Sequence, residues 1–197
     1  MKYYLLIFLI ATLFLTFVLP TLLTYRRTGT NPVTFGKEDN AHNYIGKWFK
    51  IILGLLILVV AANAFTEGWS TKYVLPVHYL EKDYINYTGW ILLHLSLIWI
   101  LIAQYQMHNS WRIGIDEKNK TELVTKGLFS VSRNPIFLGM IVSMLGAFLV
   151  LPNAITFFIA IASYLLIQIQ IRLEEEHLQR THGDVYSQYK KKTGRLL

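Results

Sequence analysis

The chain has no cysteine among its 197 residues. That absence excludes disulfide bonds, thiolate metal sites and cysteine nucleophiles. It also means that cysteine usage does not indicate the redox compartment of the protein. Charged residues are also scarce, at 16% of the chain, whereas 53% of the residues are hydrophobic. A soluble domain normally carries more charge and shorter apolar runs. The composition therefore predicts an integral membrane protein, with no metal site.

Five apolar segments are close to the roughly 20 helical residues that cross a bilayer. They are residues 4–23, 49–65, 90–105, 136–151 and 155–171. The first is expected to be retained, because no small-residue cleavage site follows it and Arg26 and Arg27 come directly after. We predict an all-α, polytopic membrane protein with a single integral domain over residues 1–197. Residues 1–105 would form three spans, and residues 106–197 a loop, a helical hairpin and a tail helix.

Basic residues are unevenly placed along the chain, which has a net charge of +7. Sixteen of the 19 lysines and arginines fall in residues 24–50, 106–134 and 172–197, and the others are Lys2, Lys72 and Lys82. By the positive-inside rule, this places the N-terminus outside and the C-terminus in the cytosol, across a cell membrane or the endoplasmic reticulum membrane. The charge thus indicates topology, and no nucleic-acid partner is expected.

The two ends of the predicted hairpin should meet on one side of the membrane. Asn134 lies 18 residues before Pro152 and Glu174 lies 22 residues after it, so similar helical lengths separate each from the turn. Asn134 is expected to cap the incoming helix, with Pro135 at its first position. The helix N-terminus and Arg133 would favour an anion, and the glutamates 174–176 an ammonium. Since successive helical residues are about 100° apart, at most two of these carboxylates can point inward.

Several polar residues allow two interpretations. His94 lies inside the third span, where we favour a neutral imidazole bonded to a neighbouring helix over a functional group. Trp111 and Arg112 are equally consistent with an interface anchor and with a place in a pocket. The tail that carries Tyr186 and Tyr189 is expected either to lie on anionic lipid or to fold back as a lid.

The order and spacing of residues over about the last 90 positions resemble a known family. The resemblance is carried by Leu123-Val124 with Gly127, by Arg133-Asn134-Pro135 with Leu138-Gly139, and by Glu174-Glu175 with Leu178, Gly183-Asp184, Tyr186, Tyr189 and Arg195-Leu196. This pattern is similar to that of the isoprenylcysteine carboxyl methyltransferase and phospholipid methyltransferase group of membrane enzymes. The first three spans match only in being apolar.

The resemblance implies an S-adenosylmethionine-dependent methyltransferase that acts on a lipid or prenylated acceptor, with its cofactor in a cytosolic-side pocket. It implies adenosine contacts from the backbone of Leu123, Val124 and Gly127. The methionine end would be surrounded by Arg133, Asn134, Glu174 and Glu175. Of these, the candidate catalytic residues are Arg133, Asn134 and Glu175, and the candidate acceptor contacts are Trp111, Arg112 and Phe137.

Two departures from the family pattern bear on the chemistry. The family usually has histidine where this chain has Asn134, and often tyrosine where it has Phe137. Asparagine forms hydrogen bonds but does not titrate near neutral pH. Either the acceptor needs no base or the substrate differs, and the acceptor and oligomeric state stay open.

Two other functions compete with the methyltransferase. A sterol-reductase-like enzyme would bind NADPH phosphates through basic residues, for which the candidates are Arg112, Lys126, Arg133 and Arg195. A non-enzymatic adaptor would use the hairpin only for packing and would bind no cofactor.

Overall fold

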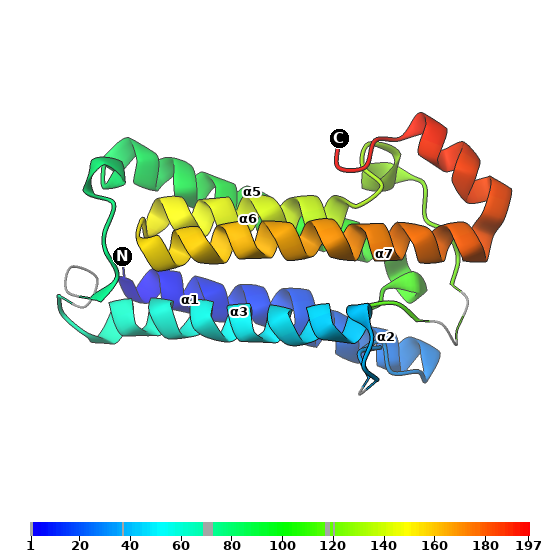
Figure 1. Ribbon diagram of the computed structural model, residues 1–197, viewed down its shortest axis with the longest axis horizontal. Coiled ribbons are helices and arrows are strands. Elements are labelled where there is room, and N and C mark those ends of the chain that lie inside the picture. The colour runs from blue at the N-terminus through cyan, green and yellow to red at the C-terminus, as the bar shows by residue number, and fades with distance from the viewer. Residues whose placement is uncertain (1, 37, 69–72, 117–118, 120) are drawn as a thin grey trace.

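The computed structural model describes residues 2–36, 38–68, 73–116, 119 and 121–197. Its long helices run back and forth along one axis (Figure 1). They are α1 (Lys2–Leu13), α2 (Leu19–Thr28), α3 (Ala41–Phe65), α5 (Asp83–Met107), α6 (Pro135–Val150) and α7 (Ala154–Lys192). A π-helix, η1 (Phe14–Val18), joins α1 to α2, and short 3₁₀ helices follow at η2 (His78–Leu80), η3 (His108–Ser110) and η4 (Gly127–Ser130). The predicted all-α fold is confirmed.

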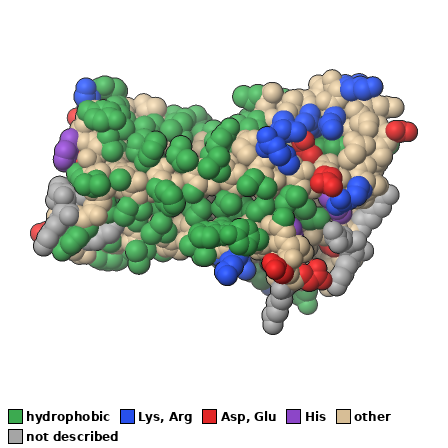
Figure 2. Space-filling model, in the orientation of Figure 1, with side chains coloured by type: hydrophobic (Ala, Val, Ile, Leu, Met, Phe, Trp, Pro, Cys, Tyr) green, Lys and Arg blue, Asp and Glu red, His purple; other side chains and the backbone are tan. Residues whose placement is uncertain are grey.

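Four helical stretches are long and apolar enough to cross a membrane: Tyr3–Thr28, Ala41–Phe65, Asp83–Ser110 and Ala154–Lys192. The fifth apolar helix, α6, has 16 residues, which is about 24 Å and so shorter than the roughly 30 Å of hydrocarbon. Side chains coloured as hydrophobic cover most of the length of the molecule in Figure 2, as expected of a surface that faces lipid. The molecule is therefore an integral membrane protein, and its described residues contain four helices of full spanning length and one shorter apolar helix.

One end of the bundle gathers the polar segments, and we call it the polar end. There α2 ends, α3 begins, α5 ends and α6 begins (Figure 1). Charged side chains crowd the same end in Figure 2. The three basic segments of the sequence thus share one end of the bundle, although Lys37, Lys118 and Lys120 within them lie outside the described residues. Which side of a membrane the polar end faces stays a prediction.

The hairpin of α6 and α7 turns where the sequence predicts. Asn153 caps α7, since its Oδ1 accepts hydrogen bonds from the amides of Ile155 and Thr156 at 3.0 Å each. The Thr156 hydroxyl accepts in return from the Asn153 amide at 3.3 Å, which completes a capping box. This turn fixes the direction of α7 and returns it to the polar end.

Small residues let α6 approach α5 closely. A Cβ atom placed on Gly146 would lie 3.0 Å from the carbonyl oxygen of Gly89, and one on Gly139 would lie 2.5 Å from Cγ1 of Ile100. Such contacts leave no room for a larger side chain. The face of α6 that carries both glycines therefore packs closely against α5.

A proline inside the first span creates a contact between α5 and the N-terminal helices. An α-helical amide at position 20 would donate to the carbonyl of Thr16, but Pro20 has no N–H. Gln104 supplies the missing donor, because its Nε2 lies 2.7 Å from the Thr16 oxygen. The π-helical turn η1 ends two residues before Pro20.

His94 has a structural explanation. Its Nδ1 lies 2.7 Å from the carbonyl oxygen of Trp90 and therefore carries the proton, which leaves Nε2 to accept from the Tyr4 hydroxyl at 2.9 Å. The ring also packs against Phe8. The interpretation of His94 as an imidazole bonded to a neighbouring helix is confirmed.

Helix α7 extends well beyond the membrane. The part of α7 before Gly183, residues 154–182, corresponds to about 44 Å of helix, longer than the roughly 30 Å of hydrocarbon. The spanning part ends at Ile171, because Arg172 and three glutamates follow. At Gly183 the backbone has φ 53° and ψ −123°, and the last turns fold back over the polar end (Figure 1). Of the two expectations for the tail, the fold-back is the one observed.

Candidate functional site

A buried carboxylate, Glu175, joins the two ends of the hairpin to the tail. The Arg133 Nε and Nη2 atoms donate to its Oε1 at 3.1 and 2.8 Å. The Arg195 Nε and Nη2 atoms donate to its Oε2, also at 3.1 and 2.8 Å. The Glu175 side chain is 7% exposed. We call Arg133, Asn134, Glu175 and Arg195 the latch. The prediction that the ends of the hairpin meet is confirmed.

The latch shifts the pKa values of its charged groups. Burial alone would raise the pKa of Glu175, but hydrogen bonds from Arg195 and Arg133, together with their charges, lower it below its usual value. The hydrogen bond to Glu175 raises the pKa of Arg195. Two guanidinium groups surround one carboxylate, so the latch carries a net positive charge.

Asn134 does not cap α6 with its side chain, and that expectation is wrong. Asn134 occupies the N-cap position with Pro135 next to it, but its side chain accepts no hydrogen bond from the helix. Instead its Nδ2 donates to the carbonyl oxygen of Arg195 at 3.0 Å and to Oε1 of Glu175 at 3.4 Å. The side chain is thus directed by Nδ2 toward Glu175 and the tail, and its oxygen does not accept from the helix amides, so Asn134 fixes the tail against the start of α6.

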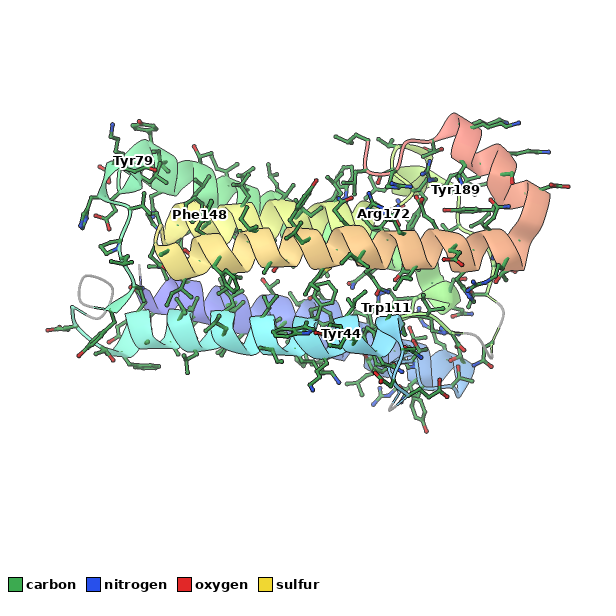
Figure 3. The ribbon with its side chains drawn as sticks, viewed as in Figure 1. Tyr44, Tyr79, Trp111, Phe148, Arg172 and Tyr189 are labelled. Atoms are coloured by element: carbon green, nitrogen blue, oxygen red, sulfur yellow. The ribbon has the colours of Figure 1, made fainter. Side chains whose placement is uncertain are left out.

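The tail also holds the loop that precedes α6. The amide of Arg133 donates to the carbonyl of Gly194 at 3.0 Å, beside a parallel bridge between Ser132 and Gly194. The Tyr189 hydroxyl donates to the carbonyl of Phe129 in η4 at 2.5 Å. Burial raises the pKa of Tyr189 to about 12, so the hydroxyl keeps its proton at neutral pH. Figure 3 shows Tyr189 at the polar end of the molecule.

The three consecutive glutamates have different surroundings. Glu175 is buried in the latch, whereas Glu176 is exposed and pairs with Arg180 at 2.8 Å. Glu174 is half-buried, and its Oε1 accepts a hydrogen bond from Nε2 of Gln170 at 2.9 Å. Burial raises the pKa of Glu174 to about 7, against a smaller lowering by the Gln170 hydrogen bond. Two of the three carboxylates are directed inward, within the predicted limit.

A polar cavity of about 470 Å³ lies where α5 ends. Among the predicted site residues, Val124 and Arg112 line it. Its other lining residues are Gln106, Met107, His108, Asn109, Ser110, Thr121 and Glu122. Arg112 is paired inside the protein, since its Nε lies 3.3 Å from Oδ2 of Asp116 and its Nη1 donates to the carbonyls of Asn109 and Trp111. The volume is in the range of small-molecule sites.

The helix η4 connects the cavity to the latch. Gln106 lines the cavity, and its Oε1 accepts the amide hydrogen of Leu128 at 2.8 Å. Gly127 has φ +65°, and a Cβ atom there would lie 2.5 Å from Nε2 of Gln106. Tyr189 holds the other end of η4. The helix η4 is thus held between a residue of the cavity wall and Tyr189 of the tail.

The remaining predicted residues lie at or near the polar end. Trp111 is 3% exposed, so of its two interpretations the exposed interface anchor does not apply (Figure 3). Leu123 is half-buried next to Val124, and Phe137 is half-buried in the first turn of α6. Within the part of the chain that the structure describes, no group of three or more His, Asp or Glu side chains is placed to hold a metal ion.

Sequence reasoning did not assign a role to Gln170 or to the hydroxyl of Tyr189. The available signal for Gln170 was its position four residues before Glu174, one helical turn away. The partner of Tyr189 is a backbone carbonyl 60 positions away, and no local pattern indicates such a contact.

A family model described as phospholipid methyltransferase matches residues 84–185, more than half of the chain. The match begins in the first turn of α5 and ends just beyond Gly183. It includes η4, α6, Arg133, Asn134 and both inward glutamates, whereas Arg195 lies beyond it. Comparison with curated proteins gives no match.

Proposed function

This chain belongs to the phospholipid methyltransferase family, and we propose that it is an S-adenosylmethionine-dependent methyltransferase whose acceptor is lipophilic or amphipathic. One observation carries the proposal. The family-matched segment brings Arg133, Asn134, Glu174 and Glu175 together at the polar end, and η4 connects them to a cavity of about 470 Å³. We further propose that the polar end faces the cytosol, as the distribution of basic residues predicts.

The charges at the polar end fit the cofactor's methionyl part, which carries both an ammonium and a carboxylate. The latch has an excess positive charge, and Arg133 lies in it at the N-terminus of α6, where an anion is favoured. Glu174 offers a carboxylate outside the latch, bonded to Gln170. In this assignment Glu175 holds the two arginines in place, and Glu174 contacts the ammonium.

The cavity fits the nucleoside part of the same cofactor. Its wall includes Val124, one of the predicted adenosine contacts. Polar side chains from the end of α5 and from η3 also line it, including Gln106 and Asn109. The cofactor is therefore proposed to extend from this cavity, past η4, toward the latch.

The bound cofactor would supply a methyl group on a sulfonium, and transfer to the acceptor's lone pair breaks the methyl–sulfur bond and leaves a thioether. The protein's contribution is to align the acceptor and to exclude water. Asn134 cannot remove a proton, since its amide does not titrate, and its Nδ2 already donates to the tail. An acceptor that is already a carboxylate or a free amine fits this site best. Trp111, Arg112 and Phe137 stay candidate acceptor contacts.

The reductase hypothesis finds less support in the placement of its basic residues. Arg133 and Arg195 both bind Glu175, and Arg112 binds Asp116. Of the four candidates for phosphate contacts, three are thus already paired with carboxylates. An adaptor that binds no cofactor is the remaining alternative.

Thermal unfolding of the purified protein in detergent tests the proposal. Saturating S-adenosylhomocysteine should raise Tm by about 5 °C or more, and NADPH should not. Val124→Trp, which fills the cavity, should remove this shift, whereas Val131→Trp should keep it, because Val131 is 52% exposed and outside the cavity lining. Stabilisation by NADPH alone would favour the reductase, and no shift with either compound would favour the adaptor.

A further inference from the structure

Gln170 carries a buried acceptor that nothing in the described part of the protein satisfies. The residue is 2% exposed, on the last turn of the spanning part of α7. Its Nε2 donates to Glu174 Oε1 at 2.9 Å, whereas its Oε1 is buried without a hydrogen-bond partner among the described residues. Buried polar atoms are almost always paired, so an orphaned carboxamide oxygen indicates a missing donor.

The orientation of the Gln170 amide is set by its neighbour. In the structure the NH₂ group of Gln170 donates to Glu174 Oε1, so the Gln170 oxygen faces away from that hydrogen bond. The amide oxygen and the Glu174 carboxylate therefore lie within a few ångströms of each other. They form a pair of acceptors, one neutral on the buried Gln170 and one anionic on the half-buried Glu174.

This pair matches a primary ammonium better than other groups. An ammonium has three N–H donors, so it can bond Gln170 Oε1 and Glu174 together while its charge is compensated. A hydroxyl could donate to Gln170 Oε1, but it carries no charge to compensate an ionised Glu174. A guanidinium of the protein is absent from this position, because Arg133 and Arg195 are both bound to Glu175.

We propose that Gln170 is a cofactor-binding residue, whose Oε1 accepts a hydrogen bond from the α-ammonium of the methionyl part while Glu174 accepts a second. The inference rests on the proposed function and adds a residue to its site. An acceptor lipid with an amine headgroup is the other source of an ammonium, and the experiment separates the two. Gln170 also orients Glu174, so its loss removes one acceptor and frees the other.

The experiment compares two ligands in wild type and in Gln170→Leu. S-adenosylhomocysteine carries the amino-acid group, and methylthioadenosine lacks it. We expect the Kd for S-adenosylhomocysteine to rise about tenfold or more in Gln170→Leu, and that for methylthioadenosine to change less than about twofold. The Tm of the ligand-free variant should change little, because the substitution removes an unsatisfied buried oxygen and also the hydrogen bond from Nε2 to Glu174.

Gln168→Leu is the matched control. Gln168 lies two residues earlier on α7, and its Oε1 accepts from Arg172 at 3.1 Å. It should leave both Kd values unchanged. If Gln170→Leu does not fold, Gln170→Met offers a flexible side chain of similar size.

Four results overturn the inference. If Gln170→Leu raises the Kd for both ligands by the same factor, or changes neither Kd, a contact between Gln170 and the α-ammonium is excluded. A third result concerns the lipid: Gln170→Leu keeps its affinity for S-adenosylhomocysteine but loses a preference of wild type for nanodiscs of phosphatidylethanolamine over nanodiscs of phosphatidylcholine. In that case the ammonium belongs to the acceptor lipid, and the assignment to the cofactor is wrong. If wild type binds no S-adenosylhomocysteine, the proposed function itself fails, and the inference fails with it.

Discussion

Arg195 and Glu175 are joined by two hydrogen bonds that converge on one oxygen, from Nε at 3.1 Å and Nη2 at 2.8 Å to Oε2. Arg133 contacts the other oxygen in the same way. Each oxygen of the carboxylate therefore serves one arginine, and the two arginines do not compete. One buried carboxylate thereby holds together the loop before α6, the extended part of α7 and the segment after it.

Removing Arg195 should loosen this arrangement. Arg195→Ala leaves Oε2 of a buried carboxylate without its donors, and we expect a loss of about 1–3 kcal/mol in the free energy of unfolding. Arg180→Ala is the control, because it breaks an exposed pair with Glu176 whose side chains are 60% and 64% exposed, and it should cost less than about 0.5 kcal/mol. Denaturant unfolding in detergent measures both. If Arg195→Ala and Arg180→Ala lower the free energy of unfolding by the same small amount, the contact of Arg195 with Glu175 adds no more stability than an exposed ion pair.

The meeting of Arg133 with Glu175 could be predicted because it follows from counting helical residues on both sides of one turn. The partner of Asn134 could not. A local rule places an asparagine before Pro135 as a helix cap, but the observed acceptor is the Arg195 carbonyl, 61 positions away. That acceptor reaches Asn134 only because the tail folds back at Gly183, and a single glycine does not indicate such a reversal.

For the three glutamates too, the sequence predicts only part of the observed arrangement. The helical angle between neighbours indicates that not all three can point inward, and this is observed. Which of them binds the arginines depends on the position of Arg195, and the sequence alone does not give it. The resemblance therefore grouped Glu174 with Glu175, whereas the structure separates a carboxylate bonded to Gln170 from one enclosed by two guanidinium groups.

Gly127→Ala should damage the connection between the cavity and the latch. The residue has φ +65°, and a Cβ atom would lie 2.5 Å from Nε2 of Gln106. Gly29→Ala is a close control, because Gly29 has φ +69° and no atom lies within 4 Å of the place that its Cβ would take. Both substitutions carry the backbone penalty of about 1–2 kcal/mol, so any larger loss in Gly127→Ala reports the clash. Gly127→Ala should also weaken S-adenosylhomocysteine binding, whereas Gly29→Ala should not; equal binding would exclude η4 from the site.

A double-mutant cycle tests the contact between Gln104 and the helix turn at Pro20. Gln104→Leu removes the donor to the Thr16 carbonyl and should cost about 1 kcal/mol. Pro20→Ala restores a backbone N–H at position 20, so the same substitution should cost less in that background. We expect a coupling free energy of about 0.5 kcal/mol or more, measured by unfolding of the four proteins in detergent. Additive effects would mean that Gln104 does not replace the missing amide.

Glu174 should give the protein a characteristic pH dependence. Its pKa is raised from 4.5 to about 7 by burial, so between these values the unfolded carboxyl has lost its proton while the folded one keeps it. Raising the pH from 5 to 7 therefore favours unfolding, and this effect levels off above pH 7. Glu175 does not contribute in this window, because its pKa is lowered and its stabilising effect is lost only below about pH 4.5.

The Tm of wild type and of Glu174→Gln, measured from pH 5 to pH 8 without ligand, isolates this effect. Histidines titrate in the same range, so the informative quantity is the difference between the two proteins. Wild type should lose stability relative to Glu174→Gln up to pH 7, whereas Glu176→Gln, which removes an exposed carboxylate, should follow wild type. Because an ammonium favours the ionised carboxylate, the affinity for S-adenosylhomocysteine should rise over the same interval in wild type and stay level in Glu174→Gln. If both proteins show the same stability and affinity profiles, Glu174 is neither buried enough to hold its proton nor close to the ammonium.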